Sequence, residues 1–108
     1  MKLQTEIFGN VVVAHAPQDI GRDQAASLTE FLSTLERGNV IVDLDNAESV
    51  DSAGLEALLD AKDVLRENGG DLKIATQNHA NRKILEITRL DQHFDVFDNV
   101  IEAVKSFS

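Results

Sequence analysis

The sequence has no cysteine, no long apolar run and no excess of basic residues. The lack of cysteine excludes disulfide bonds and thiolate metal sites. No stretch reaches the roughly 20 apolar residues of a membrane-spanning helix, and the opening residues, M-K-L-Q-T-E-I, lack the apolar core of a signal peptide. We therefore expect a cytoplasmic protein that has no membrane as a partner.

Basic residues are outnumbered along the whole chain. Ten lysines and arginines stand against 19 aspartates and glutamates, which gives a formal net charge of −9. Such a surface repels nucleic acid, so nucleic acid is not expected as a partner either. The imbalance is strongest between Asn39 and Asp71, where nine acidic residues and two basic ones give a local charge of −7. A partner that binds this part of the chain is expected to be basic.

Apolar residues make up 43% of the 108 residues, enough for the core of one domain spanning residues 1–108. Lys2–Phe8 alternates apolar and polar residues, which predicts a half-buried strand. Gly9-Asn10 is a favoured two-residue hairpin turn, and the continuously apolar Val11–Ala14 predicts an interior strand. The chain therefore opens with an antiparallel hairpin.

Helical and strand periods alternate beyond the hairpin. The expected elements are a helix from Asp23 with Gly38 as its C-cap glycine, a strand Val40–Leu44, a helix Ser52–Asn68, a strand Leu72–Ala75, a helix Ala80–Thr88, a strand Phe94–Phe97 and a final helix capped by Asp98 or Asn99. This order, β-β-α-β-α-β-α-β-α, predicts one α/β domain whose mainly parallel sheet has an antiparallel first strand.

The stretch V-D-S-A-G-L at residues 50–55 joins an acidic loop to the second of these helices. In open α/β sheets, functional groups gather in such loops at the carboxyl ends of strands. Ser52 fits the N-cap of the helix, with Asp51 just before it, near the positive end of the helix dipole. Gly54 costs about 1 kcal/mol relative to alanine, which suggests close approach by another molecule or tight internal packing. Taken alone, the motif is explained most simply as a structural cap.

Catalytic and metal-binding interpretations of this region have weaker support. Ser52 lacks a G-x-S-x-G elbow and has no histidine near it in sequence that could act as a base. The acids Asp43, Asp45 and Asp51 match no calcium-loop spacing. We expect no metal ion and no cofactor. A small-ligand or nucleotide-binding domain that uses Asp43, Asp51 and Ser52 remains an alternative.

The family that these residues resemble is the STAS domain, which joins sulfate transporters and anti-sigma factor antagonists. The resemblance rests on V-I-V-D-L, V-D-S-A-G-L-E-A-L-L-D-A and N-G-G-D-L-K-I-A, and on the later stretch I-L-E-I-T-R-L-D-Q-H-F-D-V-F-D-N-V-I-E-A-V. It covers Val40–Val104 well and the opening hairpin loosely. It implies a sheet with helices packed mainly on one face.

A stand-alone cytoplasmic domain of this kind resembles the bacterial anti-sigma factor antagonists. The resemblance implies partner switching, in which the unphosphorylated protein binds an anti-sigma factor that is also a serine kinase. The kinase phosphorylates a serine that corresponds to Ser52, and a serine phosphatase removes the phosphate. This chain would then be a substrate and a binding partner without catalytic residues of its own. The implied contact residues are Asp51, Ser52, Ala53, Gly54 and Glu56, with Asp19 or Asp23 in the loop before the first helix.

Two stretches depart from the family pattern. Family members often have glycine where this chain has Arg89, so a left-handed backbone there would cost roughly 1 kcal/mol. Arg82, Lys83 and Arg89 also form a small basic patch, a candidate second contact surface. The loop A-H-A-P-Q-D-I-G-R-D differs from the family's G-x-L-D-like turn, which leaves the partner's identity open. A second role for the same fold is an unphosphorylated accessory subunit of a transport or signalling assembly.

Overall fold

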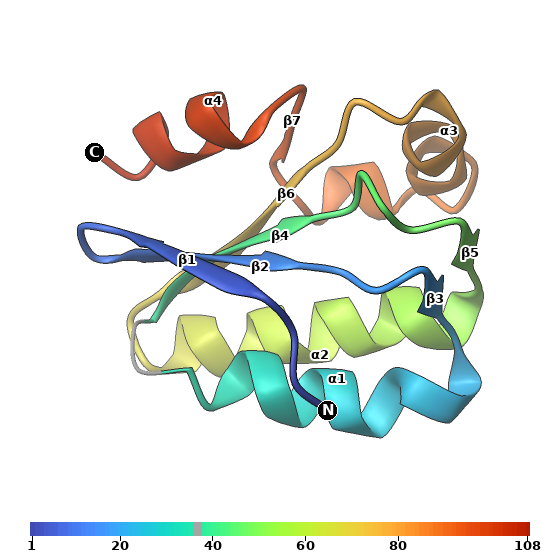
Figure 1. Cartoon of the computed structure of the whole chain (residues 1–108), viewed down its shortest axis with the longest axis horizontal. Coiled ribbons are helices and arrows are strands. Elements are labelled where there is room, and N and C mark those ends of the chain that lie inside the picture. The colour runs from blue at the N-terminus through green and yellow to red at the C-terminus, as the bar shows by residue number, and fades with distance from the viewer. Residues whose placement is uncertain (36–37) are drawn as a thin grey trace.

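A five-stranded sheet forms the centre of the computed structural model, which describes residues 1–35 and 38–108 (Figure 1). The strands lie in the order β1-β2-β4-β6-β7, with β1 antiparallel to β2 and all other neighbours parallel. Their bounds are Thr5–Phe8 (β1), Val11–His15 (β2), Asn39–Asp43 (β4), Asp71–Ala75 (β6) and Val96–Phe97 (β7). The predicted parallel sheet with an antiparallel first strand is confirmed.

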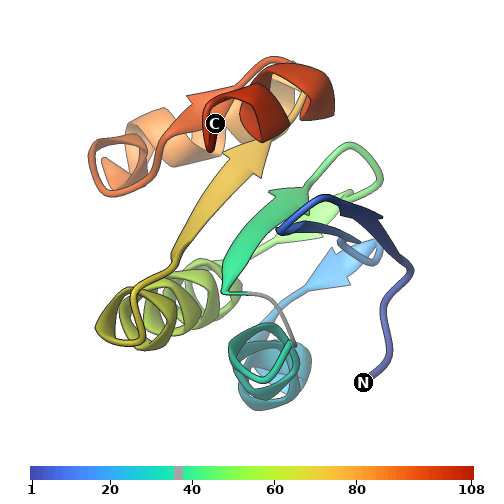
Figure 2. The same ribbon diagram turned by 90° about the vertical axis from the view of Figure 1, so that its left-hand side faces the viewer.

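The described residues form four α-helices and one short 3₁₀ helix. Their bounds are Arg22–Ser33 (α1), Ser52–Glu67 (α2), His79–Ile87 (α3), Leu90–Gln92 (η1, the 3₁₀ helix) and Val100–Lys105 (α4). Helices α1 and α2 lie side by side under one face of the sheet, and α4 lies against the other (Figures 1 and 2). The two long helices thus share one face. The sequence predicts helices mainly on one face, and the shorter α4 covers the other. In residues 1–35 and 38–108, no helix combines the length and the apolar character needed to cross a membrane.

The core lies on both faces of the sheet because side chains of a strand point alternately to its two sides. The apolar residues of β2, β4 and β6 are therefore buried on both faces of the sheet, and the three strands are almost fully buried. Toward α1 and α2, the core residues include Ala14, Val40, Val42, Leu72, Ile74, Leu28, Leu32, Leu55, Leu58 and Leu65. Toward α4, a smaller cluster contains Val11, Val13, Ile41, Ala75 and Ala103.

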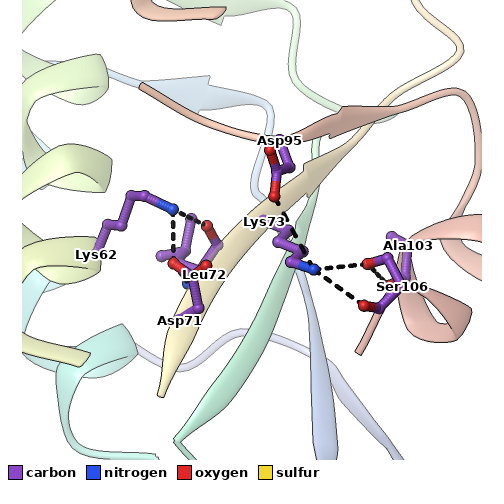
Figure 3. Close-up of polar contacts among 7 residues, drawn as sticks. All are labelled: Lys62, Asp71, Leu72, Lys73, Asp95, Ala103 and Ser106. Atoms are coloured by element: carbon purple, nitrogen blue, oxygen red, sulfur yellow. Dashed lines mark hydrogen bonds and ion pairs between the residues drawn. The ribbon is translucent and has the colours of Figure 1, made fainter. Parts of the chain in front are cut away.

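Two lysines are almost fully buried and tie helices to the sheet (Figure 3). Lys62 of α2 donates to Asp71 Oδ1 at 2.6 Å, at the start of β6. Lys73 of β6 points to the opposite face, donates to Ser106 Oγ at 2.8 Å and lies 4.2 Å from the centroid of the Phe107 ring. Because an unpaired buried cation is costly, these contacts fix α2 and the end of α4 relative to β6.

The end of the first helix differs from the prediction. α1 ends at Ser33 with Thr34 as its C-cap, so Gly38 is not the C-cap that the sequence suggested. The Thr34 hydroxyl donates to the Glu30 carbonyl at 2.8 Å and closes the last turn. Gly38 instead packs against Gly70. A Cβ added to Gly70 would lie 2.0 Å from the carbonyl oxygen of Gly38. Positions 36–37 of the predicted helix lie outside the described residues.

Candidate functional site

The site around V-D-S-A-G-L is built by a second, two-stranded sheet that the sequence did not predict. β3 (Asp19–Ile20) precedes α1, β5 (Ser49–Val50) precedes α2, and the two strands pair in parallel. The Asp51 N–H extends this pairing, since it donates to the Ile20 carbonyl at 3.1 Å. The starts of α1 and α2 are thereby held next to each other at one end of the molecule (Figure 1).

Asp51, and not Ser52 as predicted, is the N-cap of α2. Asp51 has an extended backbone, and its Oδ1 accepts a hydrogen bond from the Gly54 N–H at 3.0 Å. Its Oδ2 accepts from the Arg22 N–H at 3.3 Å, so one carboxylate serves the first turns of both α2 and α1. The hydrogen bond from Gly54, supported by that from Arg22, lowers the pKa of Asp51 below its ordinary value. The cap lies one residue earlier because the carboxylate can reach both helix starts.

Ser52 is consequently the first helical residue and is exposed. Its hydroxyl has no hydrogen-bond partner in residues 1–35 and 38–108. A side chain at this position lies beside the positive end of the α2 dipole, which favours negative charge. The site therefore presents a hydroxyl that is exposed, unused by the fold and placed where an anion is stabilised.

Gly54 is buried under β3, which decides between the two explanations for this glycine. An added Cβ would lie 2.4 Å from both the carbonyl oxygen and Cγ2 of Ile20. The glycine is therefore required by packing of α2 against β3. Gly54 thus sets how closely α2 approaches β3, whereas Asp51 and Ser52 are exposed at the surface.

The other predicted contact residues surround Ser52 on two helices and one strand. Asp19 is exposed in β3, and Asp23 is exposed in the first turn of α1. On α2, Ala53 and the exposed Glu56 line a shallow groove of about 180 Å³ between the two helices. The pairing of β3 with β5 thus brings two distant stretches of the chain, each with exposed acidic residues, next to each other.

Asp43, a member of the ligand-binding alternative, is engaged inside the protein. Its Oδ2 lies 2.9 Å from His15 Nδ1, and its Oδ1 accepts from the Asp45 N–H at 2.9 Å. In the part of the chain that the structure describes, no three histidine or acidic side chains are grouped as metal ligands. Asp43 therefore offers no free carboxylate oxygen that could join Asp51 and Ser52.

His15 joins two acidic side chains from different strands, a cluster that sequence reasoning missed. Nδ1 of His15 contacts Asp43 of β4, and Nε2 lies 2.6 Å from Glu6 Oε1 of β1. Burial lowers the pKa of His15, but the hydrogen bonds to Glu6 and Asp43 outweigh it and raise the pKa overall. The predicted hairpin turn contained a signal for this cluster. The register that follows from the turn places Glu6 opposite Val13, which is two residues from His15 on the same face of β2.

The predicted basic patch is only partly available as a surface. Arg82 forms an ion pair with Asp98, next to the end of β7. Lys83 and Arg89 are exposed. Arg89 has a φ of +62°, so the backbone at this position is left-handed and the condition for the cost considered from the sequence is met.

Comparison with known proteins identifies the fold. The family described as STAS domain matches residues 2–103. An anti-sigma factor antagonist from Mycobacterium paratuberculosis superposes with a TM-score of 0.83 at 20% identity, covering 97% of this chain and 92% of that one. The anti-sigma factor antagonist SpoIIAA in its unphosphorylated form gives 0.71 at 15% identity, covering 97% and 96%. A sulfate transporter family protein from Wolinella succinogenes gives 0.79 at 16% identity, covering 94% and 87%.

Proposed function

We propose that this chain, which belongs to the STAS domain family, is a bacterial cytoplasmic anti-sigma factor antagonist that works by partner switching. In its unphosphorylated form it binds an anti-sigma factor that is also a serine kinase, which frees the sigma factor. The kinase then phosphorylates Ser52 and the complex dissociates. A serine phosphatase restores the binding form, so the chain is the substrate of both enzymes and catalyses neither step.

The observation that supports this proposal most is the state of the Ser52 hydroxyl. It is exposed and has no hydrogen bond within the described residues, while Asp51 performs the capping. Phosphorylation therefore removes no contact that the fold needs. The added phosphoryl group meets the positive end of the α2 dipole, which stabilises it without unfolding the helix.

The surrounding charge explains how one phosphate could change partner binding. Residues 39–71 carry a local charge of −7, and phosphorylation adds roughly −1.5 to −2 charges and three acceptor oxygens. A basic partner surface shaped for the free serine would meet a different potential and a bulkier group. A coupling free energy of about 1–3 kcal/mol, typical of such switches, changes affinity roughly 5- to 150-fold.

The proposed contact surface consists of exposed residues on either side of Ser52. Asp19 and Asp23 flank it on the side of β3 and α1, and Glu56 follows one turn later on α2. Gly54 belongs to this surface only indirectly, because its missing side chain lets α2 pack against Ile20. The partner would thus contact two helix starts held together by Asp51.

The kinase reaction can be tested with purified components. The protein is incubated with ATP and a candidate anti-sigma factor kinase from the same organism, and the modified residue is mapped by mass spectrometry. We expect one phosphate on Ser52 and none on the Ser52→Ala variant. Ser49→Ala is the matched control, since Ser49 is also exposed and lies in the same acidic segment. Modification that persists in Ser52→Ala and is lost in Ser49→Ala would contradict the proposal.

A second candidate function is that of an accessory subunit in a transport assembly. The fold similarity to the Wolinella succinogenes sulfate transporter family protein favours it. In that role the surface around Ser52 docks permanently, and the serine is never modified. Equal affinity of Ser52→Ala and Ser52→Asp for the same partner would favour this candidate over partner switching.

A further inference from the structure

The two edges of the main sheet are protected to different degrees. The β7 edge is only two residues long, and the ion pair between Arg82 and Asp98 lies beside it. The β1 edge is four residues long and contains no proline. It also carries two exposed apolar side chains, since Ile7 is 58% and Phe8 is 43% exposed. Natural proteins usually shield such edges, because unpaired strand edges bind other strands.

Along this edge, some backbone groups of β1 have no hydrogen-bond partner in residues 1–35 and 38–108. In an antiparallel pair, every second residue exchanges hydrogen bonds with its partner strand. The His15 N–H donates to the Gln4 carbonyl at 2.9 Å, so in this register Gln4, Glu6 and Phe8 face β2. The N–H and C=O groups of Thr5 and Ile7 therefore point outward, away from β2.

We propose that β1 is a self-association edge, at which two copies of this chain pair their β1 strands antiparallel about a twofold axis. Two five-stranded sheets would then join into one continuous sheet across the axis. The outward backbone groups of Thr5 and Ile7 would find partners, and the exposed Ile7 side chain would be buried against the second copy. The surface contains no residue of the site around Ser52, so both switch sites would remain exposed.

The charge distribution permits a second copy as the occupant, and two identical β1 edges match each other when they pair antiparallel about a twofold axis. Two molecules of charge −9 repel each other, but this charge is unevenly placed. Residues 1–17 contain one lysine and one glutamate, so their side chains sum to zero, whereas residues 39–71 carry −7. The β1 edge thus belongs to a part of the chain whose side chains carry no net charge, where two copies can approach without net repulsion.

Glu6, the one acid in β1, does not block the edge. A charged side chain on an edge strand commonly discourages pairing. Here the Glu6 carboxylate lies 2.6 Å from His15 Nε2, on the neighbouring strand β2. The Glu6 side chain therefore leans toward β2, away from the open edge of β1. Its charge is balanced when His15 is protonated.

Sedimentation velocity over a range of protein concentrations tests this inference. We expect the wild type to shift from the mass of one chain to that of two as concentration rises. Ile7→Lys should weaken this dimerisation by at least about tenfold, because it places two like charges at a closed apolar contact. Thr5→Pro should also weaken it, because it removes an outward N–H that β2 does not use.

Ile101→Lys is the matched control, since Ile101 lies on α4 and is 66% exposed. It should dimerise like the wild type, and circular dichroism should show all variants folded. A wild type that stays monomeric at its highest soluble concentration would overturn the inference. Dimers that respond equally to Ile7→Lys and Ile101→Lys would also overturn it, because the contact would then lie away from β1.

Discussion

At the scale of single residues, Asp51 and Ser52 have separate tasks. The Asp51 carboxylate accepts hydrogen bonds from the first turns of α1 and α2, which leaves the Ser52 hydroxyl without a hydrogen bond among the residues that the structure describes. A serine that capped the helix itself would have its capping oxygen esterified on phosphorylation, and the cap contact would have to be remade by the phosphate oxygens. Because Asp51 forms the cap, phosphorylation of Ser52 as proposed would leave the capping hydrogen bonds in place.

Replacing Asp51 with alanine should therefore lower the melting temperature at neutral pH. The hydrogen bonds from Gly54 and Arg22 hold the pKa of Asp51 below its ordinary value of 3.8. The stabilisation is thus fully present above that value and is lost as the pH falls through the lower folded-state pKa. Thermal unfolding from neutral to strongly acidic pH should show the difference between wild type and Asp51→Ala shrink toward zero. Asp63→Ala, at an exposed acid of α2, should show no such convergence.

Gly54→Ala should destabilise the protein by about 1–3 kcal/mol. Helix propensity alone would predict a gain of about 1 kcal/mol from this change. The contact decides the sign, because the new methyl group would lie 2.4 Å from the backbone oxygen of Ile20, which cannot move without disturbing β3. Urea unfolding measures the difference. A variant more stable than the wild type would show that α2 does not pack against β3 this closely.

Arg89→Gly should stabilise the protein by about 1 kcal/mol, because a left-handed backbone costs a side-chain-bearing residue roughly that much. The φ of Arg89 is +62°, at the residue that follows the C-cap of α3. The same change at Lys83, inside α3, should cost about 1 kcal/mol. Chemical denaturation of both variants compares the two positions directly. Equal destabilisation would mean that position 89 is not left-handed in solution.

At the scale of elements, His15 links three neighbouring strands. It belongs to β2 and contacts Glu6 of β1 and Asp43 of β4, so a single imidazole ties the edge strand to the interior of the sheet. The strength of this tie depends on whether His15 carries a charge.

The stability of the sheet should therefore depend on pH through His15. Burial lowers its pKa, but the hydrogen bonds to Glu6 and Asp43 raise it above the ordinary value of 6.5. A raised folded-state pKa means that the stabilisation is complete below about pH 6.5 and is lost as the pH rises through the folded-state value. The stability difference between wild type and His15→Gln, measured by urea unfolding, should fall over that range. His93→Gln, at an exposed histidine outside the cluster, should keep the wild-type profile. A difference that stays constant with pH would contradict a protonated link.

The elements that were predictable from the sequence are those with long periodic patterns. The first strand follows from alternating apolar residues, the interior strands from apolar runs and α2 from the helical spacing of its apolar residues, and Asn99 caps α4 as expected. β3 and β5 escaped prediction because each has two residues and forms only when distant loops meet. The cap of α2 was misplaced by one residue for the same reason, since Asp51 is favoured by a contact with Arg22 that local sequence does not reveal.

At the scale of the whole molecule, the acidic charge and the apolar edge lie in different regions. The sequence located the acidic region, because charge can be counted along the chain. It could not show that the segment carrying Asp19 and Asp23 lies beside the start of α2, which carries Glu56, because the pairing of β3 with β5 brings these segments together. The surface proposed for the partner is thus a product of tertiary structure. The motif alone marks only its centre.

The most direct test of the central claim is the affinity of the protein for its anti-sigma partner, measured before and after stoichiometric phosphorylation of Ser52. Isothermal titration calorimetry on both forms gives the two dissociation constants. We expect phosphorylation to weaken binding at least about tenfold, with circular dichroism unchanged because the phosphate sits at an intact helix start. Equal affinities of the two folded forms would contradict partner switching at Ser52.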